Sequence, residues 1–111
     1  MLTPTPEQVM KMVEIGLARA PAEACGIFTV AGLHELPNTA DDPCDGYLID
    51  LSDLVEKLSY EFGQSCGWDD FVIWHTHPSG HIGPSSRDME NKVDGLNYFV
   101  VALPNGEGAM F

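Results

Sequence analysis

The stretch that decides the fold is residues 71–77, FVIWHTH, which continues as PSGHIGPSSRD to Asp88. Its four leading apolar residues form an unbroken run, which is typical of a strand covered on both faces and therefore central in a sheet. Pro78 has no amide proton for the strand ladder, so we expect the strand to end at His77. Because side chains alternate along a strand, His75 and His77 point to one face and Trp74 to the other.

A carboxylate follows the two histidines at close range. Two imidazoles two residues apart on a strand can bind one metal ion, and Asp88 comes after a loop long enough to return to the strand end. Two histidines and one aspartate leave one open position on a tetrahedral zinc ion, as in catalytic sites that hold a water. An H-x-H pair also occurs in barrel amidohydrolases and cupins. However, 111 residues are too few for the barrel, and a proline-bounded loop does not suit a cupin ladder.

Two motifs together resemble a known family. The spacing His-x-His-Pro, six residues, Ser85, two residues, Asp88 is similar to the signature of the JAMM (MPN+, Mov34-type) zinc metallopeptidases. Upstream, PAEACGIF (residues 21–28) resembles the family's Pro-x-Glu-x-Cys-Gly segment. The resemblance implies a three-layer α/β fold, with a mixed central β-sheet flanked by helices and related to cytidine deaminases, over one domain spanning residues 1–111. The Pro-Cys-x-x-Cys of the deaminases themselves is absent from the sequence.

The resemblance also implies roles for individual residues. His75, His77 and Asp88 are the implied ligands of one catalytic Zn²⁺, Glu23 is the implied general acid/base, and Ser85 is the implied hydroxyl that stabilises the oxyanion. Ordinary structural explanations stay open beside these roles. The ligands could be buried or capping polar residues, Glu23 could be an exposed turn residue, and Ser85 with Asp88 has the form of a helix capping box.

The other histidines and the cysteines are weaker candidates. The family pattern gives His81 no role, so we expect a solvated loop histidine near the mouth of the site. Three cysteines without a C-x-x-C pair argue against a disulfide framework and a thiolate zinc knuckle, and buried or half-buried free thiols are expected. Cys25 is expected to be a core residue and not a nucleophile, and Gly26 is expected to permit a close approach of backbone or substrate.

Helical and strand patterns surround the histidine strand. Thr5 as N-cap and Gln8 as its capping-box partner predict a first helix. Its apolar face is expected to comprise Val9, Met12, Val13 and Leu17. Residues 24–36 predict a hairpin.

The second half of the chain predicts the rest of a mixed sheet with helices. Residues 47–50 predict a short strand before an amphipathic helix that ends at Gly63 and covers the sheet. A third helix is expected after Pro84, and residues 97–103 predict another strand, after which PNGEG turns into a final AMF segment. The order of elements favours a sheet enclosed by helices.

Composition excludes several function classes. The 44% hydrophobic content indicates a globular domain, and the net charge of −12 with only five scattered Lys and Arg excludes a basic footprint for nucleic acid. The acidity either attracts basic peptides or maintains solubility. No apolar run approaches the roughly 20 residues of a membrane span, and the first residues lack secretion features, so a cytoplasmic or virion-associated protein is expected.

The expected function is zinc-dependent hydrolysis of an amide bond in a protein or peptide substrate. The resemblance implies one of three biological settings. They are phage tail assembly with cell-wall processing, processing of ubiquitin-like or sulfur-carrier proteins, and deubiquitination in large complexes. The chain has no room for the long insertions of the eukaryotic enzymes, and PAEACGIF with YLIDLSDLVEK is most similar to the phage-tail type. The alternative is a non-enzymatic MPN-type module, in which loss of a ligand or of the glutamate is expected, whereas all five positions are present here.

Overall fold

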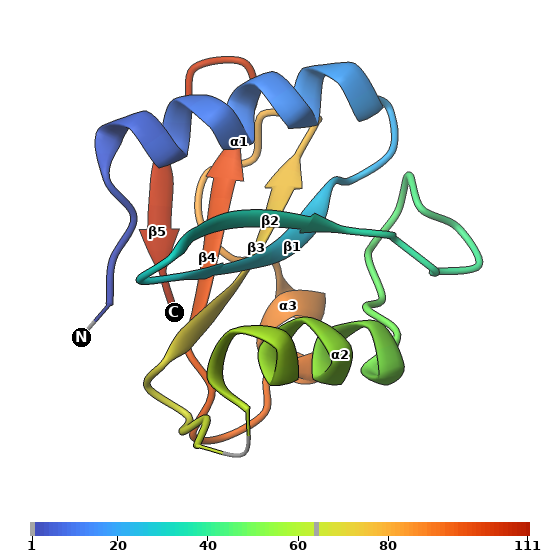
Figure 1. Cartoon of the computed structure of the whole chain (residues 1–111). Coiled ribbons are helices and arrows are strands. Elements are labelled where there is room, and N and C mark those ends of the chain that lie inside the picture. Colours follow the sequence, from blue (N-terminus) through green and yellow to red (C-terminus); the bar gives the residue numbers. More distant parts are fainter. Residues whose placement is uncertain (1, 64) are drawn as a thin grey trace.

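The histidine strand lies at the centre of a five-stranded mixed sheet (Figure 1). The computed structural model describes residues 2–63 and 65–111. The elements in chain order are α1 (Pro6–Arg19), β1 (Cys25–Thr29), β2 (Gly32–Leu36), α2 (Leu51–Phe62), β3 (Phe71–His77), α3 (Ser86–Asn91), β4 (Tyr98–Ala102) and β5 (Gly108–Met110). The sheet order is β2-β1-β3-β4-β5, and only β3 and β4 run parallel. Every residue of β3 is buried, which confirms its predicted central position.

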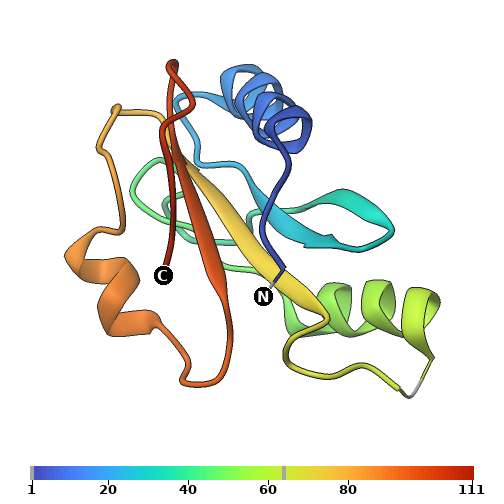
Figure 2. The same ribbon diagram turned by 90° about the vertical axis from the view of Figure 1, so that its left-hand side faces the viewer.

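The strands divide the core between the two faces of the sheet. On one face, Trp74 packs with Phe99 and with residues of α1. On the other face, Ile73 packs with Leu54 and Leu58 of α2. Figure 2 shows α1 and α3 on opposite sides of β3 and β4. The predicted α/β class, with a mixed sheet and three helices, is therefore confirmed.

The first helix begins as its capping box predicts and buries most of the predicted face, because Met12 is fully buried and Val9 and Val13 pack against the core. Thr5 Oγ1 accepts from the Gln8 N–H, and the Gln8 side chain accepts from the Thr5 N–H. Leu17, expected on the buried face, is 53% exposed, and Gly16 is buried instead. A Cβ at Gly16 would lie 2.8 Å from Thr76 Cγ2, so the absence of a side chain lets α1 contact β3 directly.

The predicted hairpin forms, and at Gly26 its second strand and the Trp74 side chain both approach the backbone closely. A Cβ at Gly26 would collide with the carbonyl oxygen of His34 and lie 2.8 Å from Trp74 Nε1. The buried indole uses this space, because Nε1 donates to the carbonyls of Ile27 and His34 at 3.3 and 3.2 Å. The expected close approach of backbone at Gly26 is therefore confirmed.

Residues 47–50 form no strand, which corrects the prediction. The Leu48 N–H donates to Asn38 Oδ1, and the Leu48 carbonyl accepts from the N–H and the hydroxyl of Thr39. These bonds occupy backbone groups that a sheet would need, so residues 37–50 form an irregular loop, which we call the Asn38 loop.

The second helix packs more loosely than predicted. None of its residues is fully buried, and Leu51 and Val55 are 71% and 52% exposed. Trp68 after the helix is also exposed, as is Cys44, for which a buried or half-buried thiol was expected. At its C-terminal end α2 is attached to the hairpin by Glu61, which accepts from the Thr29 hydroxyl at 2.6 Å and contacts His34. None of the described helices is long and apolar enough to cross a membrane.

Candidate metal centre

Three donor atoms from the end of β3 and the start of α3 converge on one point. His75 Nε2 and His77 Nε2 lie 3.2 Å apart, and each lies 3.1 Å from Asp88 Oδ2. Donors at about 2.0 to 2.1 Å from a tetrahedral zinc ion are separated by roughly 3.3 Å along the tetrahedron's edge. The three atoms therefore have the spacing of ligands that share one ion.

A hydrogen bond from His77 Nδ1 to the main chain leaves the other ring nitrogen, Nε2, facing the cluster. His77 Nδ1 lies 3.1 Å from the carbonyl oxygen of His81, and because a carbonyl only accepts, Nδ1 carries a proton. Neutral His77 then presents the Nε2 lone pair to the Asp88 carboxylate, and such lone pairs repel unless a cation lies between them. Burial lowers the pKa of His77, but the hydrogen bonds to Asp88 and the His81 carbonyl outweigh burial and raise it. A second proton on His77 can therefore supply the cation in metal-free protein.

The pKa shifts of Asp88 and His75 favour a carboxylate beside a neutral imidazole. Burial alone would raise the pKa of Asp88, but hydrogen bonds from His75, His77 and the Ser85 N–H outweigh it and hold this pKa well below its usual range. The Ser85 N–H lies 2.9 Å from Asp88 Oδ2. Burial lowers the pKa of His75 against the opposing effect of Asp88, which favours the neutral ring. A carboxylate and a neutral imidazole are the forms that bind a metal.

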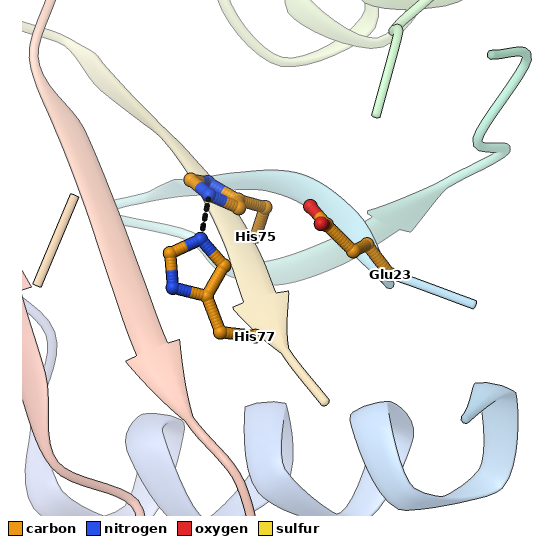
Figure 3. Close-up of side chains that lie close together, drawn as sticks. All are labelled: Glu23, His75 and His77. Atoms are coloured by element: carbon orange, nitrogen blue, oxygen red, sulfur yellow. Dashed lines mark hydrogen bonds between the residues drawn. The ribbon is translucent and has the colours of Figure 1, made fainter. Parts of the chain in front are cut away.

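Glu23 reaches the cluster because of the register between β1 and β3. The antiparallel pairing aligns Cys25 with His75, so the residues before β1 run alongside the end of β3. Figure 3 shows the Glu23 carboxylate pointing toward the histidines. One oxygen of Glu23 and one nitrogen each of His75 and His77 lie within 4.8 Å of one another, so these residues could hold a metal ion. Asp88 is closer, at 3.1 Å from both nitrogens.

The environment of Glu23 favours a proton-transfer role. Burial raises the pKa of its carboxyl to about 7, against a lowering by His77. Both main-chain polar groups of Glu23 are hydrogen-bonded. Its N–H donates to the Pro43 carbonyl at 2.7 Å, and its carbonyl accepts from Asn38 Nδ2 at 2.9 Å. A half-buried glutamate with this pKa can both accept and release a proton near neutral pH.

Ser85 forms the capping box that was the alternative to a catalytic role. Its Oγ accepts from the Asp88 N–H at 3.1 Å, and its own N–H donates to Asp88 Oδ2. The hydroxyl is the acceptor in this bond, so its proton stays available for another partner. The cap also orients Asp88 toward the histidines, and both explanations of Ser85 are compatible.

Tyr47 belongs to the centre although the sequence did not indicate it. Its ring stacks on His75, with centroids 4.3 Å apart and planes at 21°. Burial raises the pKa of the Tyr47 phenol, which therefore stays neutral. The stacking restricts rotation of His75, whose Nδ1 has no hydrogen-bond partner among the described residues. No motif spacing points to Tyr47; its one signal is an aromatic residue in a largely polar loop.

Two other predicted residues behave as expected. His81 is exposed, and it contributes its main-chain carbonyl to the orientation of His77. Cys25 is buried, and burial raises the pKa of its thiol to about 12, as suits a core residue.

A cleft of about 430 Å³ opens beside the converging donors, with Glu23, Ser85 and Asp88 in its lining. The remaining wall is largely apolar and comprises Gly46, Tyr47, Leu48, Ile49, Leu54, Ile73, Asn91, Val93, Leu96 and Tyr98. Arg87 and Asp45 line an exposed part, where Arg87 Nη1 donates to the carbonyl and to Oδ2 of Asp45 at 2.7 and 2.9 Å. A ligand in the cleft would therefore contact the polar groups of the candidate centre directly.

The fold is similar to that of a solved structure. The solution structure of protein DSY2949 from Desulfitobacterium hafniense matches with a TM-score of 0.71 and 22% sequence identity, over 99% of this chain and 81% of that chain. Similarity at this identity supports the fold alone. The sequence matches no protein-family model and no curated protein. A function is therefore inferred from the geometry of the site.

Proposed function

We propose that the protein is a zinc-dependent peptidase of the JAMM type that hydrolyses an amide bond in a protein or peptide substrate. The observation that supports it most is the triangle formed by His75 Nε2, His77 Nε2 and Asp88 Oδ2, with spacings of 3.1 to 3.2 Å. The Glu23 carboxyl beside it, with its pKa raised to about 7, supplies the base that such chemistry needs. The finer JAMM- and cytidine deaminase-like layering of the fold is part of the same proposal.

The donor set suits zinc. Two imidazoles and one carboxylate are common ligands of catalytic zinc and leave one position for water. Such sets also bind Fe(II) in oxygenases, so metal analysis must compare the two. Glu23 is assigned to proton transfer and Asp88 to the metal, because Asp88 is the carboxylate at ligand spacing from both histidines.

The residues around the metal position can divide the work of amide hydrolysis. A bound zinc ion would supply Lewis acidity here and lower the pKa of its water toward about 7. Glu23 would take a proton from the attacking water and deliver it to the leaving amine, since a pKa near 7 favours both transfers. The Ser85 hydroxyl would donate its free proton to the carbonyl oxygen as negative charge develops there. Loss of such a donor typically costs about 10²- to 10³-fold in rate.

Metal analysis tests the ligand assignment. Metal-free protein is supplied with equal concentrations of Zn²⁺ and Fe²⁺, and the bound metal is measured by elemental mass spectrometry. We expect about one zinc ion per chain. Asp88→Asn preserves shape but removes the anionic ligand, so it is expected to lose the zinc, whereas Asp45→Asn on the exposed part of the cleft is expected to keep it. Failure of the unmodified protein to bind zinc would refute the proposal.

A hydrolysis assay tests the role of Glu23. The zinc-loaded protein is offered a panel of peptides, isopeptides and muropeptides, and products are identified by mass spectrometry. Glu23→Gln is expected to keep zinc and to lose about 10²- to 10⁴-fold in rate, the usual range for removal of a general acid/base. Full activity in Glu23→Gln would exclude the assigned role. A zinc-loaded protein that cleaves no member of the panel would favour the non-enzymatic module.

A further inference from the structure

The cleft beside the candidate centre has apolar walls on two sides. The Asp50-capped helix α2 and the Asn38 loop contribute Leu54 and Ile49 on one side, and the segment after α3 contributes Val93 and Leu96 on the other. Tyr98 lies between them, and its hydroxyl accepts from the Val93 N–H at 3.0 Å, which holds the second wall in place. The two walls thus come from separate parts of the chain. The first packs on the sheet through Leu54, and the second is held by the hydrogen bond to Tyr98.

Several of these wall residues retain surface that a ligand could cover. Ile49, Leu54 and Leu96 are half-buried, and Val93 is 52% exposed. Covering apolar surface is favourable by roughly 25 cal/mol per Å². A volume of about 430 Å³ lies in the lower part of the range typical of ligand sites, which suits one large side chain with its flanking main chain.

The charged residues of the cleft lining are Glu23, Asp45, Arg87 and Asp88, and Asn91 adds a neutral polar side chain beside Val93. Glu23, Ser85 and Asp88 belong to the candidate centre. Asp45 is already paired with Arg87, through bonds at 2.7 and 2.9 Å to its carbonyl and its carboxylate. Of the charged residues in the lining, Arg87 and Asp45 therefore neutralise each other, and the apolar walls offer no charge to a cationic or anionic side chain.

We infer that this cleft binds a large apolar or aromatic side chain of the substrate residue next to the scissile amide. The inference rests on the proposed function, which places that amide at Glu23, and it adds a preference that the metal ligands cannot provide. Leucine or phenylalanine at this position covers the surface of Leu54, Val93 and Leu96, whereas glycine covers none of it.

Binding is measured separately from hydrolysis. The zinc-loaded Glu23→Gln protein is titrated with the peptides acetyl-Gly-Gly-Xaa-Gly-Gly-amide, in which Xaa is Gly, Ala, Leu, Phe or Lys, and dissociation constants are obtained from NMR chemical shifts. The Leu and Phe peptides are expected to bind roughly tenfold or more tightly than the Gly and Lys peptides. Equal affinities across the series would overturn the inference.

A pair of matched substitutions locates the preference. Val93 and Val55 are both 52% exposed, but only Val93 lines the cleft. Val93→Trp fills space between the walls and is expected to reduce the Phe-to-Gly affinity ratio to about one, whereas Val55→Trp is expected to keep the ratio roughly tenfold or higher. A Phe-to-Gly affinity ratio that stays roughly tenfold in Val93→Trp would show that the preference arises elsewhere, and would overturn the inference.

Hydrolysis of the same peptides by the unmodified protein separates this inference from the proposed function. Cleavage of all five peptides at equal rates, with equal affinities, would leave the proposed function standing and refute the apolar subsite. A Phe preference that Val93→Trp abolishes, without cleavage of any peptide, would refute the peptidase and leave the cleft as a site for apolar peptides.

Discussion

The two faces of the central sheet use the same strand in different ways. On the α1 face, the polar atoms of β3 are satisfied within the protein: Trp74 Nε1 donates to two carbonyls, and the Thr76 hydroxyl accepts from the Ala24 N–H at 2.9 Å. On the opposite face, His75 and His77 bring their Nε2 atoms together against a carboxylate. The polar atoms of the first face are paired within the protein, whereas the second face brings three donor atoms to a spacing at which they could hold a metal ion. We therefore expect stability to depend mainly on the first face and reactivity on the second.

Truncation of Trp74 is expected to have the largest effect on stability. Trp74→Ala empties a fully buried position on the α1 face, and such changes typically cost about 3–5 kcal/mol. The candidate ligands on the other face are untouched, so we expect molecules that stay folded to bind zinc in the same ratio as wild type. Urea unfolding of metal-free protein, followed by far-UV circular dichroism, measures the loss. Val30→Ala, at a position 83% exposed, is the control and is expected to stay within about 0.5 kcal/mol.

Neutralisation of Glu23 is expected to have a smaller effect of opposite sign. Its pKa is about 7 in the folded protein against 4.5 for an unperturbed group, so folding favours the protonated form. The contribution of Glu23 to the stability of the metal-free protein therefore falls as pH rises from about 4.5 through 7, and Glu23→Gln lacks this pH-dependent loss while it keeps that of the other groups. The variant is expected to be more stable at pH 8 by about 1–2 kcal/mol, after allowance for solvent screening of a partly exposed carboxyl.

The pH profile of that difference identifies its cause. The stabilities of Glu23→Gln and wild type are compared by urea unfolding at pH 5 and pH 8, with the exposed Glu107→Gln as control. The gain is expected at pH 8 and should fall to roughly a quarter of that value at pH 5, which is close to the unperturbed pKa of 4.5. A difference that is independent of pH would show that packing, and not the charge of Glu23, is responsible.

Removal of the Arg87–Asp45 pair is expected to have the smallest effect. The two side chains are 59% and 69% exposed, and such ion pairs typically contribute less than about 1 kcal/mol. Arg87→Ala should therefore lower the urea midpoint only slightly, and less so in high salt. A loss above about 2 kcal/mol would mean that Arg87 is needed to hold the Asn38 loop against α3.

Side-chain alternation and helix capping, which involve only residues close in sequence, predicted several features correctly. Alternation along the histidine strand correctly placed Trp74 opposite His75 and His77, and capping rules located the start of α1 and of α3. The motif spacing singled out Glu23 and Asp88, which the structure brings to the two histidines. Their roles as base and ligand stay predictions until metal binding and hydrolysis are measured.

The mistaken expectations concern features that depend on tertiary contacts. The apolar pattern of α1 favoured Leu17 over Gly16, because it could not show that β3 approaches the helix too closely for a side chain. Apolar residues at 47–50 indicated a strand, whereas a side-chain amide binds that backbone instead. The stacking of Tyr47 on His75 follows from the path of that loop and from no spacing in the sequence.

The Asn38 side chain holds both ends of a bend. Its Nδ2 donates to the carbonyls of Glu23 and Gly46 at 2.9 and 3.0 Å, and its Oδ1 accepts from the N–H groups of Ala40 and Leu48, both at 3.1 Å. The segment that enters the loop, the segment that leaves it and the segment that bears the candidate base are thus joined by one amide.

Such a junction makes the intervening chain a suitable place for insertions. Asp41 and Asp42 are exposed, and the turn from Asp42 to Asp45 is closed by its own hydrogen bond. Lengthening a loop whose ends are already held costs little, about 0.6 kcal/mol for each doubling. Residues added between Asp41 and Asp42 would therefore extend outward from the neighbourhood of the candidate centre. In evolution or in the laboratory, this bend can acquire a substrate-recognition segment while the sheet beneath it stays unchanged.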